Sequence, residues 1–380
     1  MLESTPIIWA KTVTEAHEFR REQDQLGRVW TLLGINHDVA HDGDWFCATL
    51  GGRSIFVQRF GVAIKVFENR CAHRFFPLRT AKKGKGAVVC DFHHWRYDQD
   101  GRAVGIPMCP EMFGTTPRDL NARLKPVEIA TCGSLIFGRF ASDAKKESLA
   151  DYLGDGFPIL EAMCEIPTSP NYIEHTVAAH WKLLIHITLD DYHIVAVHPG
   201  TFGKGGYLKN DIVNYFRFGL HSAYFTGGGD TLSSMAADCR NGNYRPLDYR
   251  IFNIFPNLSV SLFWAAPYWY AFAQQFVPLA PGRTLQRGWF YRTKMLANEE
   301  GILSSLIRPI YEPIRARIVR HYIDKITRED NVICEALQSV AHQADGAPIL
   351  GKQEQRIGWF EESYARAMNP MMQSDASKPS

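Results

Sequence analysis

Two short motifs, each pairing a cysteine with a histidine, constrain this chain more than any other feature of its sequence. Cys71 and His73 form a Cys-x-His motif, and after an interval of 16 residues Cys90 and His93 form a Cys-x-x-His motif. Thiolate and imidazole both bind transition metals, so the two motifs predict one metal centre held between two loops. A zinc site, an iron–sulfur site and a coincidence of spacing are the three interpretations to separate.

The way the ligand types are divided favours iron and sulfur. Structural zinc sites usually keep one ligand type within each short motif. Here each motif mixes the two types, which suits a [2Fe–2S] cluster with two cysteines on one iron and two histidines on the other, the Rieske arrangement. The chain resembles Rieske proteins at these four residues, and Trp95, Tyr97 and Gly101 follow the second motif as they do there. Zinc and coincidence remain as the alternatives.

Two positions depart from the usual Rieske pattern. His94 stands where glycine is common, so two adjacent histidines compete for one role. The Cys-x-x-His spacing selects His93 as the ligand and predicts that His94 faces outward. The first loop reads CAHRFFPL, where proline and small residues are more usual. That change predicts different packing near the cluster rather than different ligation.

A second group of candidate ligands follows in the segment LDDYHIVAVHPG. On a helix, Asp190 and His193 share one face, at i and i+3. His198 lies five residues beyond His193 and would point elsewhere on an ideal helix, but Pro199 favours a bend or an end before it. Two histidines and one carboxylate form the facial triad of non-haem Fe(II) oxygenases. The alternative is chance, because the chain has 14 histidines.

Together, the two groups resemble the large (α) subunit of Rieske non-haem iron oxygenases, the aromatic ring-hydroxylating and demethylating family. The resemblance covers most of the chain and implies a third iron ligand far downstream. The matching stretch is TREDNVICEALQ, in which Asp330 is followed by Glu335 and Gln338 at the family's spacing. Asp330 is therefore expected to be the carboxylate ligand, with Glu329 as its rival. An acid at a helix N-terminus, favoured by the helix dipole, is the structural alternative for Asp330.

The resemblance gives Asp190 a different, catalytic role. It implies a carboxylate that bridges His193 of one chain and His93 of the next by hydrogen bonds, because a metal-bound imidazole needs an acceptor on its other nitrogen. This implies a head-to-tail ring, a homotrimer, with the presence of a small β subunit left open. His186 and Ile187 replace the family's frequent Glu-Asn pair. His186 either bonds to the bridge or is a satisfied interior histidine, and the second reading is favoured.

The pattern along the chain predicts an α+β protein. Short β-type runs separated by turns suggest a small all-β Rieske domain, and a mixture of β-type runs and amphipathic segments suggests a catalytic domain of antiparallel sheet covered by helices. The expected parts are an N-terminal helical segment packing on the catalytic domain (1–27), the Rieske domain (28–145), the catalytic iron domain (146–367) and a disordered tail (368–380). Prolines and glutamines within the apolar stretch Leu258 to Pro281 favour two strands joined at residues 265–268 over a membrane helix.

The composition limits which binding partners and which cellular compartment we expect. The formal charge is +2, so there is no basic excess for binding nucleic acid. The N-terminus has no apolar signal region, and the eight cysteines form no dense framework. We therefore expect reduced thiols, a cytoplasmic location and no membrane.

The expected chemistry follows from the resemblance. The glycine-rich segment GTFGKGGYLKN lacks the order of a dinucleotide-binding motif, so NAD(P)H should act indirectly through a separate reductase or a ferredoxin. The resemblance implies a terminal oxygenase that uses O2 to hydroxylate an aromatic or other apolar substrate once, or twice in cis, at Fe(II). O- or N-demethylation is the alternative, and a Rieske electron-transfer protein without oxygenase chemistry is a weaker one. Arg217 and His221 are candidate anchors for a substrate carboxylate.

Overall fold

The computed structural model describes residues 9–141, 147–166, 170–201, 213–266, 268–294, 302–344, 346 and 348–369. The chain divides into two compact units. One is Gln23–Lys146, and the other combines Met1–Glu22 with Glu147–Ser380. Most of the glycine-rich segment expected after the second iron histidine, and the tail from residue 370, lie outside the described residues.

The Gln23–Lys146 unit is built from three small antiparallel sheets. The first sheet contains β1 (Thr31–Ile35), β10 (Leu135–Arg139) and β9 (Glu128–Cys132) in that order. The second contains β4 (Ala63–Glu68), β3 (Arg53–Phe60), β2 (Asp44–Leu50) and β5 (Lys83–Lys85). The third contains β6 (Val88–Val89), β7 (Arg96–Tyr97) and β8 (Ala103–Gly105). Three short helical segments complete the unit: η1 (Asn36–Val39), α3 (Cys109–Phe113) and α4 (Pro117–Leu120).

Tight turns between short strands shape this unit. At the β2–β3 turn, Gly51 has a φ of +53°, and a Cβ there would lie 2.6 Å from the Cα of Gly27. Only glycine fits both the left-handed backbone and this close approach. The strands enclose a buried cluster that contains Cys71 and Cys90. The two cysteines are thus fixed within the core of the unit.

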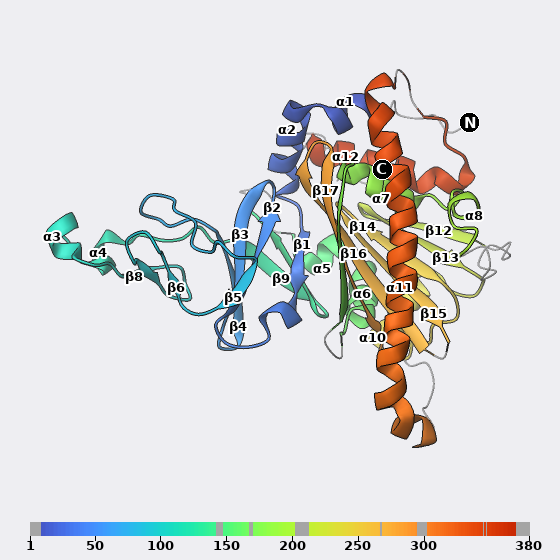
Figure 1. The fold of residues 1–380 in the computed structure, drawn as a ribbon, viewed down its shortest axis with the longest axis horizontal. Helices are drawn as coiled ribbons and strands as arrows, with labels where there is room; N and C mark the ends of the chain where they lie inside the picture. The colour runs from blue at the N-terminus through green and yellow to red at the C-terminus, as the bar shows by residue number, and fades with distance from the viewer. Residues whose placement is uncertain are drawn as a thin grey trace, which may run out of the picture. The chain divides into compact units, whose positions relative to one another are not determined.

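The larger unit is organised around one antiparallel sheet of seven strands (Figure 1). Its order is β11 (Asn171–Val177), β17 (Arg283–Arg292), β16 (Tyr268–Ala280), β15 (Leu258–Ala265), β14 (Arg250–Ile254), β13 (His221–Thr226) and β12 (Val213–Phe218). Strands β15 and β16 pair from Leu258 with Gln275 to Ala265 with Tyr268. The predicted pair of aromatic strands is confirmed. Among the described residues, no helix has both the length and the apolar character that a bilayer span requires.

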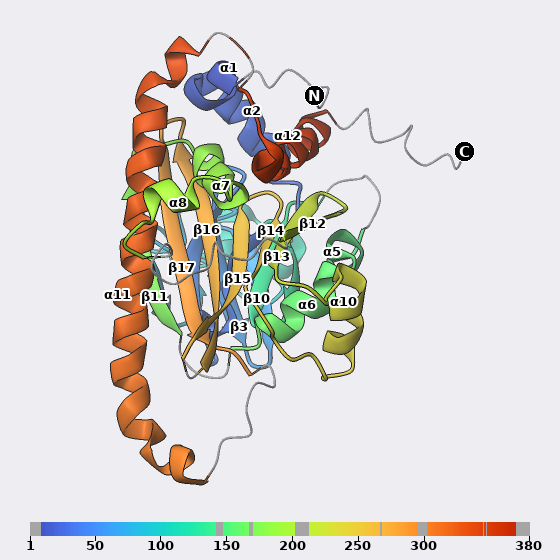
Figure 2. The same ribbon diagram turned by 90° about the vertical axis from the view of Figure 1, so that its right-hand side faces the viewer.

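Helices cover this sheet. The described ones are α1 (Trp9–Thr14), α2 (Ala16–Leu26), α5 (Leu149–Leu153), α6 (Gly156–Met163), α7 (Trp181–Leu189), α8 (Ile194–Val197), α10 (Leu232–Arg240), α11 (Ile302–Val340) and α12 (Gln355–Met368). Short 3-10 turns lie at η2 (Ala341–Gln343) and η3 (Lys352–Glu354). Figure 2 shows α11 running along the sheet beside β11, with α7 and α8 near its upper half. The expected fold class, a small β domain plus an α+β domain, is confirmed.

Helix α11 is held on the sheet by apolar side chains. Val319 and Ile323 pack in one buried cluster with Ile173, Tyr270 and Phe290. Helix α7 in turn packs against α11, α12 and the strands β15 and β16. Residues near the end of α7 and residues of α11 are thereby brought together although they are far apart in the sequence.

Candidate metal centres

The first candidate centre lies on two loops of the β unit. Cys71 and His73 follow β4, and Cys90 and His93 lie between β6 and β7. Both cysteines are 1 % exposed, and the ring centroids of the two histidines are 4.7 Å apart. The Nδ1 atoms of His73 and His93 are buried and have no hydrogen-bond partner in the described part of the chain. Two thiols and two free ring nitrogens are therefore available together, which is the donor set of a Rieske cluster.

The two loops are near copies in their backbone. The Phe75 amide donates to the Cys71 carbonyl at 3.0 Å, and the His94 amide donates to the Cys90 carbonyl at 2.8 Å. Phe75 has a φ of 62° and His94 a φ of 57°, so each turn closes through a left-handed residue. This backbone explains why glycine suits the position of His94. His94 is exposed, whereas the ring of His93 faces that of His73.

Hydrogen bonds and burial tune the sulfur side of this centre. The Tyr97 hydroxyl accepts the Ala72 amide at 3.0 Å and lies 3.0 Å from Cys71 Sγ. Burial and the neighbouring thiol raise the pKa of Tyr97, so the phenol stays protonated and can donate a hydrogen bond to a deprotonated, metal-bound sulfur. Burial raises the pKa of Cys90, while the amides of Phe92 and His93 lower it. Hydrogen bonds to both sulfurs are a means of setting a cluster's reduction potential.

The histidine side of the centre is packed by aromatic rings. His73 stacks on Trp95 with centroids 4.9 Å apart and planes 3° from parallel. Desolvation lowers the pKa of His73, and the neighbouring His93 lowers it further. A neutral imidazole is the form that binds a metal. Two phenylalanines beside the two rings remain exposed: Phe92, next to His93, and Phe113, next to His73.

The second candidate centre forms where α7 gives way to α8. Helix α7 ends at Leu189, His193 precedes the single turn of α8, and His198 follows it. The expectation that Asp190 and His193 share a helix face is therefore wrong. The two residues are instead brought together by a turn in which Asp190 Oδ1 accepts the Tyr192 amide at 2.7 Å and the His193 amide at 3.2 Å. The short side chain of Asp190 competes with the helix for these donors.

Asp330 of α11 completes this centre. Its Oδ1 lies 2.9 Å from His198 Nε2 and 3.5 Å from His193 Nε2. One ligand atom from each of the three residues lies within 4.8 Å of the others. Asp330 Oδ1 is buried but accepts no hydrogen bond in the described part of the chain. The two imidazoles and the carboxylate therefore lie close together without being oriented for hydrogen bonds to one another. Ligands with bonds of about 2.1 Å to one ion are themselves about 3 Å apart, so the set fits a metal such as Fe(II).

Carboxylates lie on the outer nitrogens of both histidines. His198 Nδ1 is 2.8 Å from Glu329 Oε2, and His193 Nδ1 is 3.5 Å from Asp190 Oδ2. Metal-binding histidines commonly have such acceptors, which fix the ring orientation. Glu329 thus lies on the outer side of His198, whereas Asp330 lies with the inner nitrogens. The geometry favours Asp330 over Glu329 as the ligand.

The electrostatics of the three groups are mutually dependent. Burial lowers the pKa of His193, but Asp190 and Asp330 outweigh it and raise the value to about 9. Burial likewise lowers the pKa of His198, and Asp330 and Glu329 raise it above the ordinary value. Burial raises the pKa of Asp330, and the two imidazoles bring it below its usual range. A metal would take the place of the protons that the histidines otherwise hold.

Two residues of α11 hold α7 in register with Asp330. Glu335 Oε1 accepts the Ala178 amide at 2.9 Å, and Gln338 Oε1 accepts the His180 amide at 2.8 Å. Both amides lie just before α7 begins at Trp181. Glu335 and Gln338 were singled out by spacing alone, and the sequence carried no signal for this contact.

Three further polar residues considered from the sequence are engaged elsewhere. His186 Nε2 is 2.8 Å from Glu361 Oε1, and Arg217 Nη1 is 2.6 Å from Glu362 Oε2. His221 is fully internal, with Nε2 donating to the Tyr152 carbonyl at 2.8 Å and Nδ1 accepting the Phe255 amide at 3.1 Å. Both ring nitrogens of His221 are thus occupied, which disfavours it as a substrate anchor, whereas Nη2 of Arg217 has no hydrogen-bond partner among the described residues.

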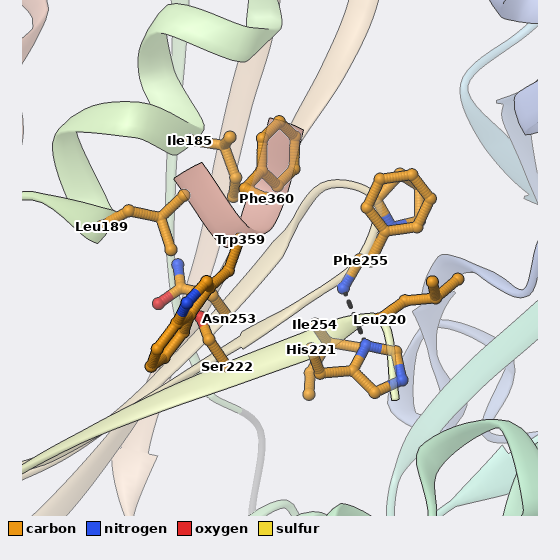
Figure 3. A pocket seen from close by; sticks show the side chains of 11 residues that line it. Ile185, Leu189, Leu220, His221, Ser222, Asn253, Ile254, Phe255, Trp359 and Phe360 are labelled. Carbon is orange, nitrogen blue, oxygen red and sulfur yellow. Dashed lines mark hydrogen bonds between the residues drawn. The ribbon is translucent and has the colours of Figure 1, made fainter. Parts of the chain in front are cut away.

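A small cavity lies between α7, α12 and the strands β13 and β14 (Figure 3). Its empty volume is about 250 Å³, open solvent included. Ile185, Leu189, Trp359 and Phe360 supply much of its apolar lining, and His221 lies at one end. None of the residues of the second candidate centre lines it.

Comparison with known proteins places both centres in familiar domains. A model of the Rieske [2Fe-2S] domain matches residues 29–123, and a model of the catalytic domain of ring-hydroxylating α subunits matches residues 167–370. The large subunit of anthranilate 1,2-dioxygenase from Burkholderia cepacia is 24% identical over 249 residues, which is 62% of this chain and 56% of that protein. The oxygenase subunit of glycine betaine monooxygenase from Chromohalobacter salexigens is 31% identical over 196 residues, covering 49% and 40%. The chain thus spans roughly half the length of these two relatives.

Solved structures share the fold over almost the whole chain. A quaternary ammonium Rieske monooxygenase aligns with a TM-score of 0.75 and 17% identity, covering 97% of this chain and 96% of the other. A naphthalene 1,2-dioxygenase from Rhodococcus sp. aligns with a TM-score of 0.74 and 17% identity, covering 98% and 95%. At these identities the likeness shows the fold alone.

Proposed function

Since this chain belongs to the family of Rieske-type ring-hydroxylating oxygenase α subunits, whose catalytic-domain model matches more than half of it, we propose that it is the terminal oxygenase of a multicomponent system. It takes electrons from a separate NAD(P)H-dependent reductase, directly or through a ferredoxin. It uses them with O2 to hydroxylate a small aromatic or otherwise apolar substrate. We assign residues 28–145 to the Rieske domain, 146–367 to the catalytic domain and 1–27 to a helical segment on the catalytic domain.

The convergence of His193, His198 and Asp330 carries this proposal. A Rieske electron carrier needs only the four residues of the first centre. A second set of two imidazoles and one carboxylate is needed when the same protein also oxidises a substrate at a mononuclear iron. The open side of such a set leaves coordination positions for O2 beside a substrate.

In this proposal each residue has a defined task. Cys71, Cys90, His73 and His93 hold the cluster, and Tyr97 donates a hydrogen bond to the Cys71 sulfur. His193, His198 and Asp330 hold the mononuclear iron, which when bound supplies the activation of O2. Glu329 orients the His198 ring through its Nδ1, at 2.8 Å. Asp190 accepts a hydrogen bond from the outer nitrogen of His193 and links it to the neighbouring subunit.

We propose a head-to-tail homotrimer, in which Asp190 of one subunit meets His93 of its neighbour. The exposed side chains beside His73 and His93 support this arrangement, since Phe92 is 46 % and Phe113 39 % exposed. Beside Asp190 and His193, Tyr192 is 70 % and Val195 61 % exposed. Exposed apolar groups at both centres suit a contact between them. A ring results when one surface binds a different surface of an identical chain. This ring is also compatible with an additional small β subunit.

A second candidate function, O- or N-demethylation, is favoured by one observation. The matching proteins include glycine betaine monooxygenase, and the matching structures include a quaternary ammonium monooxygenase. Hydroxylation of a methyl group on nitrogen or oxygen yields an unstable product that releases formaldehyde. The same two centres would serve this reaction.

The test is one turnover of anaerobically reduced protein under ¹⁸O₂. The substrates are aromatic acids, methylated aromatics, apolar rings and quaternary ammonium compounds. A product with one or two labelled oxygen atoms supports hydroxylation and separates mono- from dioxygenation, and formaldehyde supports demethylation. A protein that holds the cluster but binds no mononuclear iron would contradict the proposal and leave an electron carrier.

A further inference from the structure

Arg356 of α12 is a fully buried cation close to the second centre. It is 0 % exposed, and its guanidinium reaches three acceptors. Nη2 donates to Asp191 Oδ1 at 3.0 Å and to the Thr188 carbonyl at 3.2 Å, and Nη1 donates to Asn253 Oδ1 at 2.9 Å. A buried charge of this kind is maintained only when it is paired and hydrogen-bonded.

Two of these acceptors, the Thr188 carbonyl and Asp191, lie at the two ends of one short segment. Thr188 belongs to the last turn of α7, and Asp191 lies between Asp190 and the metal-site histidine His193. The Asp191 amide also donates to the Gln353 carbonyl at 3.3 Å, from the segment that leads into α12. The contacts with Arg356 and Gln353 therefore attach the turn 190–193 to α12 and, through Asn253, to β14.

The turn is otherwise held by its own hydrogen bonds and by the start of α8, where the Ala196 and Val197 amides both donate to the His193 carbonyl at 2.9 Å. It lies outside both helices, since α7 ends at Leu189 and α8 begins at Ile194. Asp190 Oδ1 accepts the Tyr192 and His193 amides, so a change of the turn would move the Asp190 carboxylate and the His193 ring together. The placement of both groups depends on the backbone that Arg356 holds.

We propose that Arg356 is a positioning residue for the mononuclear metal site. Through Asp191 and the Thr188 carbonyl, its guanidinium fixes the turn that aims His193 Nε2 at the site and places Asp190 on the outer nitrogen of the ring. This inference rests on the proposed function, because it takes His193 to be a metal ligand. Arg356 itself touches neither substrate nor metal.

The geometry of the guanidinium matters as well as its charge. Arg356 also lies over the ring of Tyr224 at 5.3 Å and that of Tyr215 at 5.9 Å. A planar fork can serve several acceptors in fixed directions while its faces contact aromatic rings, whereas a lysine ammonium cannot reproduce this arrangement. Packing alone would not require a buried cation here, since an apolar side chain fills such a space without a desolvation cost.

The experiment compares Arg356→Lys with a charge-neutral pair, Arg356→Gln with Asp191→Asn. The neutral pair leaves no unpaired buried charge and serves if the lysine variant fails to fold. Arg250→Gln is the matched control. Arg250 is also buried, at 1 % exposure, and donates to Asp230 at 2.9 Å and to the Thr226 carbonyl at 2.6 Å, but it contacts no residue of the turn.

Each protein is prepared with an intact cluster and stripped of mononuclear iron. Anaerobic titration with Fe(II) gives a dissociation constant, the electron paramagnetic resonance signal of the Fe(II)–nitric oxide adduct reports the symmetry of the site, and thermal unfolding gives Tm. We expect both Arg356 variants to bind Fe(II) about 10- to 100-fold more weakly, as for other residues that orient metal ligands, with an altered adduct signal. The control should lose a comparable amount of Tm and keep the wild-type affinity and signal.

Two results would overturn the inference. One is Fe(II) affinity and an adduct signal equal to wild type in the Arg356 variants. The other is a loss of affinity that follows Tm equally in the Arg250 control, which would assign Arg356 to stability alone. If the wild type binds no mononuclear Fe(II), the proposed function itself fails, so the two failures are distinguishable.

Discussion

At the scale of single residues, the hydroxyl of Tyr97 is a precise probe of the cluster. It lies 3.0 Å from Cys71 Sγ and is held there by the Ala72 amide. A hydrogen bond to a cluster sulfur stabilises the reduced form, which carries more negative charge. We expect Tyr97→Phe to lower the reduction potential by about 40 mV, which corresponds to a net hydrogen bond of about 1 kcal/mol in a one-electron couple.

Potentiometric titration of the cluster's visible absorption measures this change. Tyr152→Phe is the control, because that hydroxyl donates to the Phe255 carbonyl at 2.7 Å in the catalytic unit. An unchanged potential in Tyr97→Phe would show that the hydroxyl does not act on the sulfur.

His221 gives a pH-dependent contribution to stability. Burial lowers its pKa to about 4, below the ordinary value of 6.5 for histidine. Between these values the unfolded chain binds a proton that the folded chain does not, so stability falls as pH decreases from 6.5 towards 4. The full loss is on the order of 3 kcal/mol. Above this window both states hold a neutral imidazole, and the effect vanishes.

Urea unfolding of wild type and His221→Gln at several pH values checks this expectation. Near neutral pH, the variant should be less stable than the wild type, because glutamine must repack the end of the cavity that His221 occupies. Its stability should decline less steeply as the pH falls below 6.5. Parallel pH profiles for the two proteins would contradict the assignment of a neutral, buried His221.

At the scale of elements, the rotation of α11 decides which acid binds the metal. Asp330 faces His193 and His198, while Glu329 contacts the outer nitrogen of His198. We expect Asp330→Ala to lose the mononuclear iron and keep the cluster. Glu329→Gln should keep the iron but bind it about 10- to 100-fold more weakly. Iron and sulfide analysis, together with Fe(II) titration, separates the two. A variant pair with the opposite behaviour would make Glu329 the ligand.

The sequence determined this site only in part. Ligand types and short spacings predict Cys71, His73, Cys90 and His93 as cluster ligands, because those residues lie on two local loops. The sequence could not decide between Glu329 and Asp330 by itself, since adjacent residues on a helix point about 100° apart and the rotation of α11 depends on packing. Arg356 carried no local signal, because its partner Asp191 is 165 residues away.

The same limit explains the error about α7. A helical pattern predicts that Asp190 and His193 share a face, but α7 ends at Leu189. Asp190 captures the amides of Tyr192 and His193 with its own side chain, which favours a turn over another helical turn. The ligand identities are independent of this local structure.

At the scale of the whole molecule, the fold class could be predicted from the sequence because each unit has its own pattern of apolar and turn residues. Short alternating runs and glycine turns predict the β unit, and longer strands with amphipathic helices predict the α+β unit. The order of the seven-stranded sheet was not accessible, since β11 pairs with β17 more than a hundred residues later. Such pairings depend on tertiary packing rather than on any local motif.

The proposed head-to-tail assembly predicts how mixed oligomers should behave. A chain with Cys71→Ser lacks a working cluster, and a chain with Asp330→Ala lacks the mononuclear iron. Each alone should be inactive, whereas co-expressed mixtures should regain part of the activity because one chain's cluster serves its neighbour's iron. Separately purified homo-oligomers that are assayed together without exchange are the control. Mixed oligomers without any activity would contradict transfer between subunits.

The fate of the reduced cluster on exposure to O2 tests most directly whether its electrons pass to a metal held by Asp330. Protein reduced anaerobically and loaded with a substrate identified by the labelled-oxygen experiment is mixed rapidly with O2, and the visible absorption of the cluster is followed. We expect rapid reoxidation in the wild type and a cluster that stays reduced on the same timescale in Asp330→Ala. Equal reoxidation in both proteins would show that the electrons do not pass to a metal held by Asp330.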